Sequence, residues 1–374
     1  MIDTICLLIP REHFTFVDLS SQGAPTWHLQ AHTDNYQKYI KNPTVLTKRT
    51  NKYYPRLTGY KRNFGNDTNI KIEFSAPKIL YGNNLDELKE SDFEKLIDTL
   101  HQRLKEMGAM VDKKYLINAH VSSVHYSKNI QLQDGFTASH VISEINKVDL
   151  RKTFDLARTR FVNNGQSLYM HATSHQMVVY DKIADIGKAK KRAIDKDQTP
   201  QQLELFKELK KNKPLDILRF EIRLSKRQKL KSVLKKCGYV QEPTFKYIYN
   251  TKISKDIVQL YWNELVKEGS LWLFTVETTK KELLRSIYKA NPTITPKRAI
   301  YLVGLLTLAK EADGMRELRS LLNKGSSDRT WYRISKDVRE ASEQIATNKV
   351  RSWVKQIDTT LENYKPLIKI YEKI

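Results

Sequence analysis

The chain has 374 residues, and its 65 lysines and arginines against 42 aspartates and glutamates give a formal net charge of +23. Apolar residues make up 40% of the sequence, which excludes wholesale disorder and can fill the cores of about two domains. A charge excess of this size favours a polyanionic partner, most often nucleic acid, over a basic surface that is merely solvated.

Strand and helix patterns are mixed over the first 225 residues. Residues 91–108 begin with Ser91 as a candidate cap, carry Glu94 three positions later and end at a glycine, which predicts a helix. Two further helices are predicted over 137–148 and 201–211. Strand-like patterns occur at residues 4–10, 13–19, 69–76, 115–126, 176–182 and 216–224. We therefore predict an α+β domain with an antiparallel sheet over residues 1–245.

Helical spacing of apolar residues dominates from about residue 250 onward. We predict an all-helical domain over residues 246–374. Within it, residues 314–338 resemble a helix-turn-helix, with a short turn before a second helix that Ser326 or Ser327 can cap.

The second helix of this pair is predicted to be amphipathic. Its inward face is formed by Trp331, Ile334 and Val338. Its outward face carries side chains of the kind that read a DNA groove, namely Arg329, Thr330, Arg333 and Lys336. Such helix pairs also occur in proteins that do not bind DNA, and it is the net charge that favours DNA contact here.

The two cysteines, Cys6 and Cys237, are far apart in the sequence, which excludes a disulfide scaffold and a cysteine-based zinc site. The first residues include an acidic side chain where a signal peptide requires positive charge. The longest apolar run, residues 299–309, is shorter than the ~20 residues that cross a membrane. We therefore expect a soluble cytoplasmic protein with no membrane partner.

The strand-like run at 216–224 has one apolar and one polar face. Leucine, phenylalanine and isoleucine side chains alternate with Arg219, Glu221 and Arg223, and period two places the two sets on opposite sides of a sheet. One interpretation is a solvated face with weak cross-strand ion pairs. The other is a functional face, which would need partners on neighbouring strands.

Other strand-like runs supply such partners. Tyr180 and Lys182 share a face, as do Lys71 and Glu73, and His120 lies on a strand that could neighbour Glu221. A bulge would be needed to bring His125 to the same face as His120. A single strand histidine is more often simply packed. Together, however, carboxylate, imidazole, phenol and lysine suit a divalent metal that polarises a phosphate beside a nucleophile.

Several stretches resemble, in their order and rough spacing, the gene II/X replication proteins of filamentous phages and of related plasmids and integrated elements. These stretches are "MIDTICLLIP" (1–10), "SAPKILYGNN" (75–84), "VSSVHYSKN" (121–129), "VVYDK" (178–182) and "LRFEIRL" (218–224). The resemblance covers nearly the whole chain. It implies similarity to the Rep_trans plasmid initiators and, more distantly, to the HUH endonucleases, and hence an HUH/Rep-like nicking domain.

The activity that this resemblance implies is the initiation of rolling-circle replication in the cytoplasm of a bacterial host cell. Such proteins nick one strand at a double-stranded origin, remain attached to the 5′ phosphate through a tyrosine and leave a 3′ hydroxyl as primer. The DNA must be single-stranded or melted at the nick. A host helicase and a polymerase are the further partners implied.

The same resemblance suggests site residues. The tyrosine of the family's Y-x-K element corresponds to Tyr180, with Lys182 as its lysine, and the glutamate of the R-x-E element corresponds to Glu221. The phage proteins carry an aspartate at the position of His125. An expected Mg²⁺ or Mn²⁺ ion would bind Glu221 and His125.

Two alternatives stay open at this stage. A strict histidine-hydrophobe-histidine motif is absent, so His120 or Glu73 could complete the metal ligands. Tyr126 and Tyr169 lie on neighbouring candidate strands and compete with Tyr180 as the nucleophile.

Basic residues along the chain are expected to hold the DNA, although each could also be part of a solvated face. These are Lys128, Lys190, Lys191, Arg192, Arg219, Arg223, Arg329, Arg333 and Lys336. A rival hypothesis is a non-enzymatic initiator or repressor of winged-helix type, which explains the charge but not the polar strand faces. An RNA-binding protein is disfavoured because glycine-aromatic RNA-binding motifs are absent.

Overall fold

A computed structural model gives the structure of the chain. It describes residues 1–17, 28–32, 36–41, 52–62, 68–148, 154–162, 165–186, 215–266, 271–275, 279–311, 314–322, 327–345 and 350–368. The described residues form two packed units. The first lies within residues 1–131, 173–258 and 363–374, and the second within 132–172 and 259–362. The boundary at residue 245 between a nicking domain and a helical DNA-binding domain remains a prediction.

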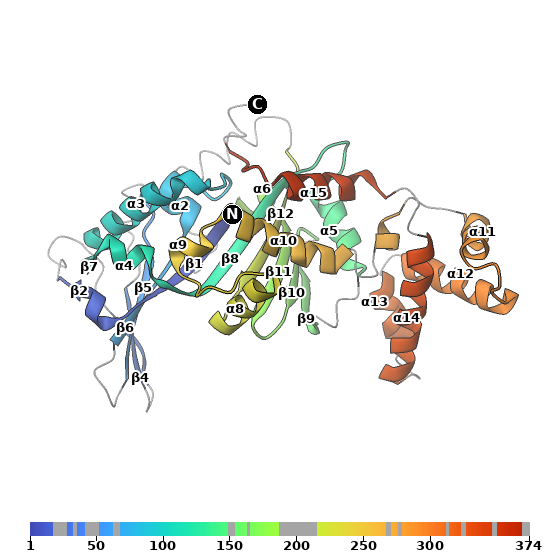
Figure 1. Cartoon of the computed structure of the whole chain (residues 1–374), viewed down its shortest axis with the longest axis horizontal. Coiled ribbons are helices and arrows are strands. Elements are labelled where there is room, and N and C mark those ends of the chain that lie inside the picture. The colour runs from blue at the N-terminus through green and yellow to red at the C-terminus, as the bar shows by residue number, and fades with distance from the viewer. Residues whose placement is uncertain are drawn as a thin grey trace. The chain divides into compact units, whose positions relative to one another are not determined.

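The first unit is built on a large antiparallel sheet (Figure 1). In spatial order its described strands are β3 (His28–His32), β4 (Tyr36–Lys41), β5 (Arg56–Arg62), β6 (Thr68–Ser75), β1 (Ile2–Ile9), β8 (His120–Gln131), β12 (Ile217–Leu224) and β11 (His175–Asp181). A separate short pair joins β2 (Phe14–Phe16) to β7 (Ala109–Val111). The predicted antiparallel α+β architecture is therefore confirmed.

Helices cover this sheet because its central strands are apolar on at least one side. The helices of the first unit are α2 (Ala76–Tyr81), α3 (Phe93–Glu106), α4 (Lys113–Ile117), α6 (Lys182–Ile186), α8 (Arg227–Lys236), α9 (Phe245–Ile248) and the start of α10 (Thr251–Val266). Helices α2 and α4 pack on β1, α6 packs on β11 and β12, and α8 packs on β8 and β12. In β12 the apolar side chains Phe220 and Ile222 are buried as predicted.

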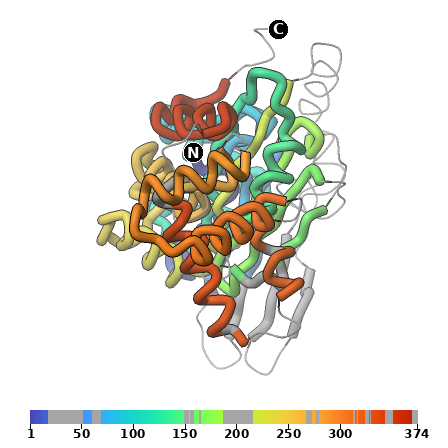
Figure 2. Tube along the Cα trace, turned by 90° about the vertical axis from the view of Figure 1, so that its right-hand side faces the viewer, coloured from blue at the N-terminus to red at the C-terminus, as the bar shows by residue number. Residues whose placement is uncertain are grey.

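The second unit contains α5 (Ala138–Asn146), the antiparallel strands β9 (Asp155–Val162) and β10 (Ser167–His171), and a set of helices. These are α11 (Lys280–Ala290), α12 (Pro296–Lys310), α13 (Gly314–Leu322), α14 (Asp328–Ile345) and α15 (Ser352–Asn363). Helix α12 packs on α11, α13 and α14, which are orange to red in Figure 2. No described helix is long and apolar enough to cross a membrane.

Several predicted elements need correction. Residues 115–117 of the predicted strand belong to α4, and within the described part of the predicted 13–19 the strand β2 covers Phe14–Phe16. Helix α3 begins at Phe93 because a 3-10 turn over Glu90–Asp92 precedes it, so Ser91 is not its cap. The predicted helix over 201–211 lies outside the described residues.

The predicted helix pair at 314–338 has the expected elements. Helices α13 and α14 form as predicted, and the Thr330 amide donates to Ser327 Oγ at 3.4 Å, which fits a cap at the start of α14. Trp331 and Val338 are buried. The two helices touch where the Arg319 guanidinium lies over the Trp331 ring. Their identity as a DNA-binding helix-turn-helix stays a prediction.

Candidate active site

Strand register brings the predicted nucleophile and the two foremost metal-ligand candidates together. Tyr180 of β11 lies directly opposite Arg219 of β12, and Arg223 lies opposite His125 of β8. Period two then places these residues and Glu221 on one side of the sheet. We call this side, defined by His125, Tyr180, Arg219, Glu221 and Arg223, the polar face.

Glu221 is the centre of this face. The Tyr180 hydroxyl donates to its Oε2 at 3.1 Å, and His125 Nδ1 lies 3.2 Å from its Oε1. Arg223 Nε donates to the same Oε1 at 2.7 Å. Three neighbouring strands therefore supply side chains to one carboxylate.

The charge of Glu221 is stabilised although the residue is buried. Burial alone would raise its pKa, but the Arg223 guanidinium, the His125 contact and the Arg219 guanidinium outweigh that effect and hold the pKa well below its usual value. Glu221 is 1% exposed, whereas the side chains of His125 and Arg223 are 20% and 17% exposed. The carboxylate is thus ionised, and only its His125 and Arg223 side approaches solvent.

Arg219 is held inside the protein by partners that the sequence did not reveal. Its guanidinium donates to Ser127 Oγ at 2.7 Å and to the Asn84 carbonyl at 2.6 Å, and lies 2.8 Å from Asp3 Oδ1. Arg219 is 2% exposed. We therefore reassign Arg219 from DNA contact to the internal charge network around Glu221.

The Tyr180 hydroxyl is protonated in the folded protein. Burial, and then the negative charge of Glu221, raise the pKa of its hydroxyl well above the usual value, and the residue is 6% exposed.

Lys182 opens α6 instead of continuing the strand face of Tyr180. Its Nζ lies 5.8 Å from the centre of the Tyr180 ring and has no hydrogen-bond partner among the described residues. Burial, and then the charge of Arg219, lower the pKa of this amine to about 7. A fraction of Lys182 is therefore uncharged near neutral pH and could accept a proton.

The two rival tyrosines lie elsewhere. Tyr126 points to the opposite side of the sheet, where it is fully buried and its hydroxyl donates to the Ile248 carbonyl at 3.2 Å. Tyr169 belongs to β10 in the second unit and pairs with Arg160. Among the three tyrosines considered, only Tyr180 touches Glu221.

The two further ligand candidates are also separate from Glu221. His120 lies at the other end of β8, where its Nδ1 is 3.3 Å from Arg227. Glu73 lies on β6, opposite Cys6 and Arg56. The structure brings neither side chain to the Glu221 carboxylate.

A divalent metal fits the pair formed by Glu221 and His125. Two adjacent ligands of an octahedral ion with bonds of about 2.1 Å are about 3 Å apart, close to the 3.2 Å between Oε1 and Nδ1. Within the described part of the chain no third histidine, cysteine or carboxylate joins them. Mg²⁺ commonly keeps water and substrate phosphates as its other ligands. Arg223 competes for the same oxygen, so binding of an ion would require that guanidinium to give up Oε1.

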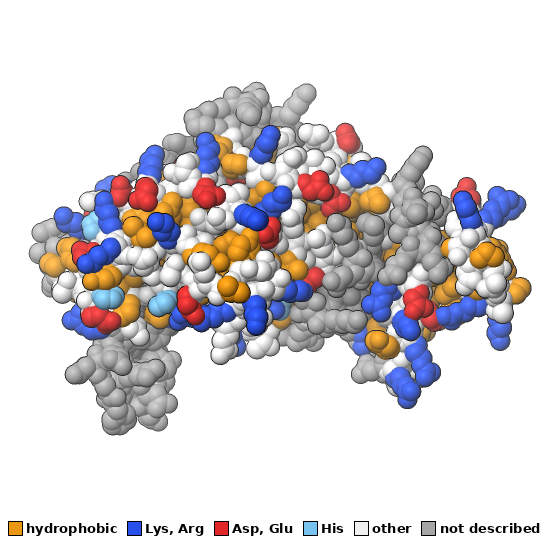
Figure 3. Space-filling model, viewed as in Figure 1, with side chains coloured by type: hydrophobic (Ala, Val, Ile, Leu, Met, Phe, Trp, Pro, Cys, Tyr) orange, Lys and Arg blue, Asp and Glu red, His pale blue; other side chains and the backbone are white. Residues whose placement is uncertain are grey.

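Arg223, like Arg219, belongs to the charge network of Glu221, and the other predicted DNA-binding residues fall into three groups. Lys128 is 1% exposed, binds Glu87 and donates to the Lys365 carbonyl at 2.8 Å, so we reassign it to the core. Arg329, Arg333 and Lys336 are exposed on α14, where lysine and arginine side chains gather in Figure 3. Lys190, Lys191 and Arg192 lie outside the described residues.

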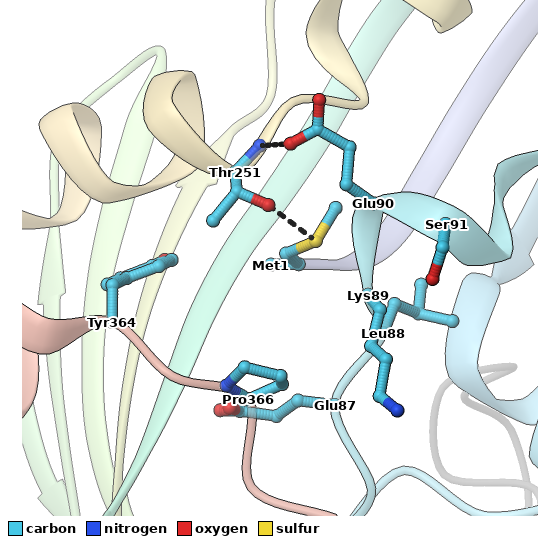
Figure 4. A pocket seen from close by; sticks show the side chains of 9 residues that line it. All are labelled: Met1, Glu87, Leu88, Lys89, Glu90, Ser91, Thr251, Tyr364 and Pro366. Carbon is cyan, nitrogen blue, oxygen red and sulfur yellow. Dashed lines mark hydrogen bonds between the residues drawn. The ribbon is translucent and has the colours of Figure 1, made fainter.

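A pocket next to Glu87, the carboxylate that binds Lys128, is shown in Figure 4. It has a volume of about 330 Å³ and is bordered by Met1, Glu87, Thr251, Tyr364 and Pro366, among others. Across it the Thr251 amide donates to a Glu90 carboxylate oxygen at 3.2 Å. None of the predicted site residues lines this pocket.

Sequence reasoning missed Asp3, Asn84 and Ser127. All three lie within the stretches that carry the family resemblance, which was the available signal. Comparison of the sequence with protein-family models, with curated proteins and with solved structures finds no match in any of the three.

Proposed function

We propose that the protein initiates rolling-circle replication by nicking one DNA strand through Tyr180. The observation that supports this proposal is the meeting of Tyr180, Glu221 and His125, each from a different strand, at one carboxylate. The large positive net charge and the exposed basic side of α14 supply affinity for DNA.

In the proposed reaction the Tyr180 oxygen attacks the scissile phosphorus. A bond forms between that oxygen and the phosphorus, and the bond from phosphorus to the 3′ oxygen breaks. The products are a 5′-phosphotyrosine and a free 3′ hydroxyl. One phosphodiester replaces another, so the step is close to energetically neutral and can run backward to close the strand.

The residues around Tyr180 have distinct tasks in this proposal. Glu221 accepts the hydroxyl hydrogen bond and so orients the oxygen. Arg219, directly opposite Tyr180, supplies positive charge to the developing phenolate. Once local opening turns the Tyr180 hydroxyl away from Glu221, Lys182, whose pKa is about 7, takes the phenol proton and returns it to the leaving 3′ oxygen. A metal held by Glu221 and His125 would polarise the phosphate.

Because Tyr180 is 6% exposed, DNA can reach it only after the side chains above it move. Local opening is then expected to limit the rate, as in other enzymes whose sites are covered before reaction.

The test is a nicking assay on a supercoiled plasmid that carries the DNA flanking the coding sequence, with Mn²⁺ or with EDTA. Wild-type protein should relax the plasmid in Mn²⁺ only and should become covalently attached to the 5′ end. Tyr180→Phe should abolish both, while the matched control Tyr169→Phe should retain both. Nicking by Tyr180→Phe would overturn the assignment of the nucleophile.

A second function, DNA binding without cleavage, is favoured by one observation. The charges of Glu221 and Arg219 are fully compensated inside the protein, as expected of a purely structural network. If wild-type protein binds the same plasmid DNA tightly but never nicks it, this non-enzymatic initiator or repressor becomes the better explanation.

A further inference from the structure

The polar face continues past Arg223 and His125 into a hollow of about 490 Å³ in the first unit. Its floor contains a row of paired residues across four strands. Arg56 lies opposite Glu73, Glu73 lies opposite Cys6, and Cys6 lies opposite Ser123. With neighbouring strands ~4.8 Å apart, the row is about 14 Å long. The hollow therefore runs across the strands of the sheet rather than along them.

The lining of this hollow is strongly basic. Four cationic side chains, Arg56, Lys71, Lys226 and Arg227, and one carboxylate, Glu73, line the hollow, and Arg227 also pairs with Glu242 at 2.8 Å outside the lining. The Nε atoms of Arg56 and Arg227 are buried and have no hydrogen-bond partner among the described residues. Helix α8 also begins here, which adds partial positive charge to that of the side chains. The lining thus suits an anionic ligand.

The hollow lies next to the candidate active site along β8 and the end of β12. Ser123 precedes His125 by two residues on β8, and Ser225 follows Arg223 by two residues after β12. Period two places Ser123 on the same side of the sheet as His125. Both serines line the hollow. A chain of phosphates lying in the hollow could therefore extend toward His125 and Arg223, the two partly exposed partners of Glu221.

We propose that this hollow binds the phosphodiester backbone of single-stranded DNA next to the nick. The identity of the ligand as DNA rests on the proposed function, whereas the preference for a polyanion rests on the lining alone. A volume of about 490 Å³ is that of a small-ligand site. Basic grooves that follow a backbone are a common way to hold a single strand.

The experiment measures binding of a fluorescein-labelled deoxythymidine oligonucleotide by anisotropy over a range of salt concentrations. The test variant is Arg56→Gln with Lys226→Gln. The control is Lys95→Gln with Lys105→Gln, two exposed lysines of α3 that remove the same charge outside the hollow. Each phosphate that is no longer neutralised should reduce the slope of log affinity against log salt by about 0.7 for a single strand. The test variant should therefore reduce the slope by about 1.4, and the control should leave it unchanged.

Equal slopes for the two double variants would overturn the proposal, provided that both unfold in urea at the wild-type midpoint. Tighter binding of a uridine oligonucleotide than of the deoxythymidine probe would overturn the assignment to DNA. The nicking assay is independent of this result. If wild-type protein never nicks, yet only the test variant has a reduced slope, the binding site stands and the proposed function fails.

Discussion

The polar face of the sheet and the exposed side of α14 both carry arginine side chains, but the first lies in the protein interior and the second in solvent. Arg219 is 2% exposed and has three polar partners, whereas Arg329 and Arg333 are exposed to solvent. Charges on the polar face are therefore part of the core, and their loss should affect stability. Charges on α14 contribute little to folding and are available to a partner.

The largest effect is expected from Arg219→Leu. Removing one member of a buried ion pair leaves Asp3 uncompensated and should lower the free energy of unfolding by about 3–5 kcal/mol. Urea unfolding followed by circular dichroism measures this change. The matched variant Arg329→Leu on α14 should change stability by less than about 0.5 kcal/mol. Similar losses in both variants would remove the distinction between the two regions.

A pH-dependent effect is expected from Lys182. Its pKa falls from 10.5 to about 7 on folding, so between these values the unfolded chain binds more protons than the folded protein. The free energy of unfolding should therefore rise with pH in this window, by at most about 1.4 kcal/mol per pH unit from this group. Lys182→Met should lose that part of the slope in urea unfolding across the window. An unchanged slope would show that the amine stays charged, and Lys336→Met on α14 serves as the control that changes nothing.

Tyr180→Phe and a matched variant on α14 compare the two regions through the loss of one hydroxyl group. A hydrogen bond to an ionised carboxylate contributes about 1.5–3 kcal/mol, so this variant should be destabilised by that amount. Tyr332→Phe removes a hydroxyl from a tyrosine on α14 that is 57% exposed and should be neutral. A neutral or stabilising result for Tyr180→Phe would contradict the expectation and would indicate a hydrogen bond retained for chemistry at the expense of stability.

The smallest effect on stability is expected on α14 itself. Arg329→Gln, Arg333→Gln and Lys336→Gln together should leave the free energy of unfolding within about 0.5 kcal/mol of wild type. Binding of duplex DNA should weaken, with the salt slope reduced by about 0.9 for each phosphate that the variant no longer neutralises. Titrations of wild type and the triple variant at several salt concentrations test this. An unchanged slope would mean that this side of α14 does not face DNA.

Local patterns predicted much of the fold. The alternation in β12 correctly separated Phe220 and Ile222 from Arg219 and Glu221, and Thr137 caps α5 where a helix was predicted. These features depend on neighbours within a few residues. His125, Tyr180 and Glu221 were chosen from the resemblance to the gene II/X proteins, whereas the register between β8, β11 and β12 that brings them together was not predicted.

Burial of the polar face could not be predicted in the same way. Asp3 supplies the negative charge that pairs with Arg219, and the Asn84 carbonyl accepts a hydrogen bond from it. Both residues are far from β12 in the sequence. An arginine paired with a distant aspartate has the same local pattern as a solvated one. The reassignment of Arg219 and Lys128 to the core therefore required the three-dimensional arrangement.

The ion pair between Asp3 and Arg219 also constrains how the chain can fold during synthesis. Strand β1 is made first, yet β8, which lies between it and β12, and β12 itself follow much later. Contacts of such long sequence separation form slowly. A chain released before residue 217 would expose one edge of β8 and leave Asp3 without its arginine. Under the proposed function, a chain that ends before β12 lacks Glu221 and cannot cut DNA.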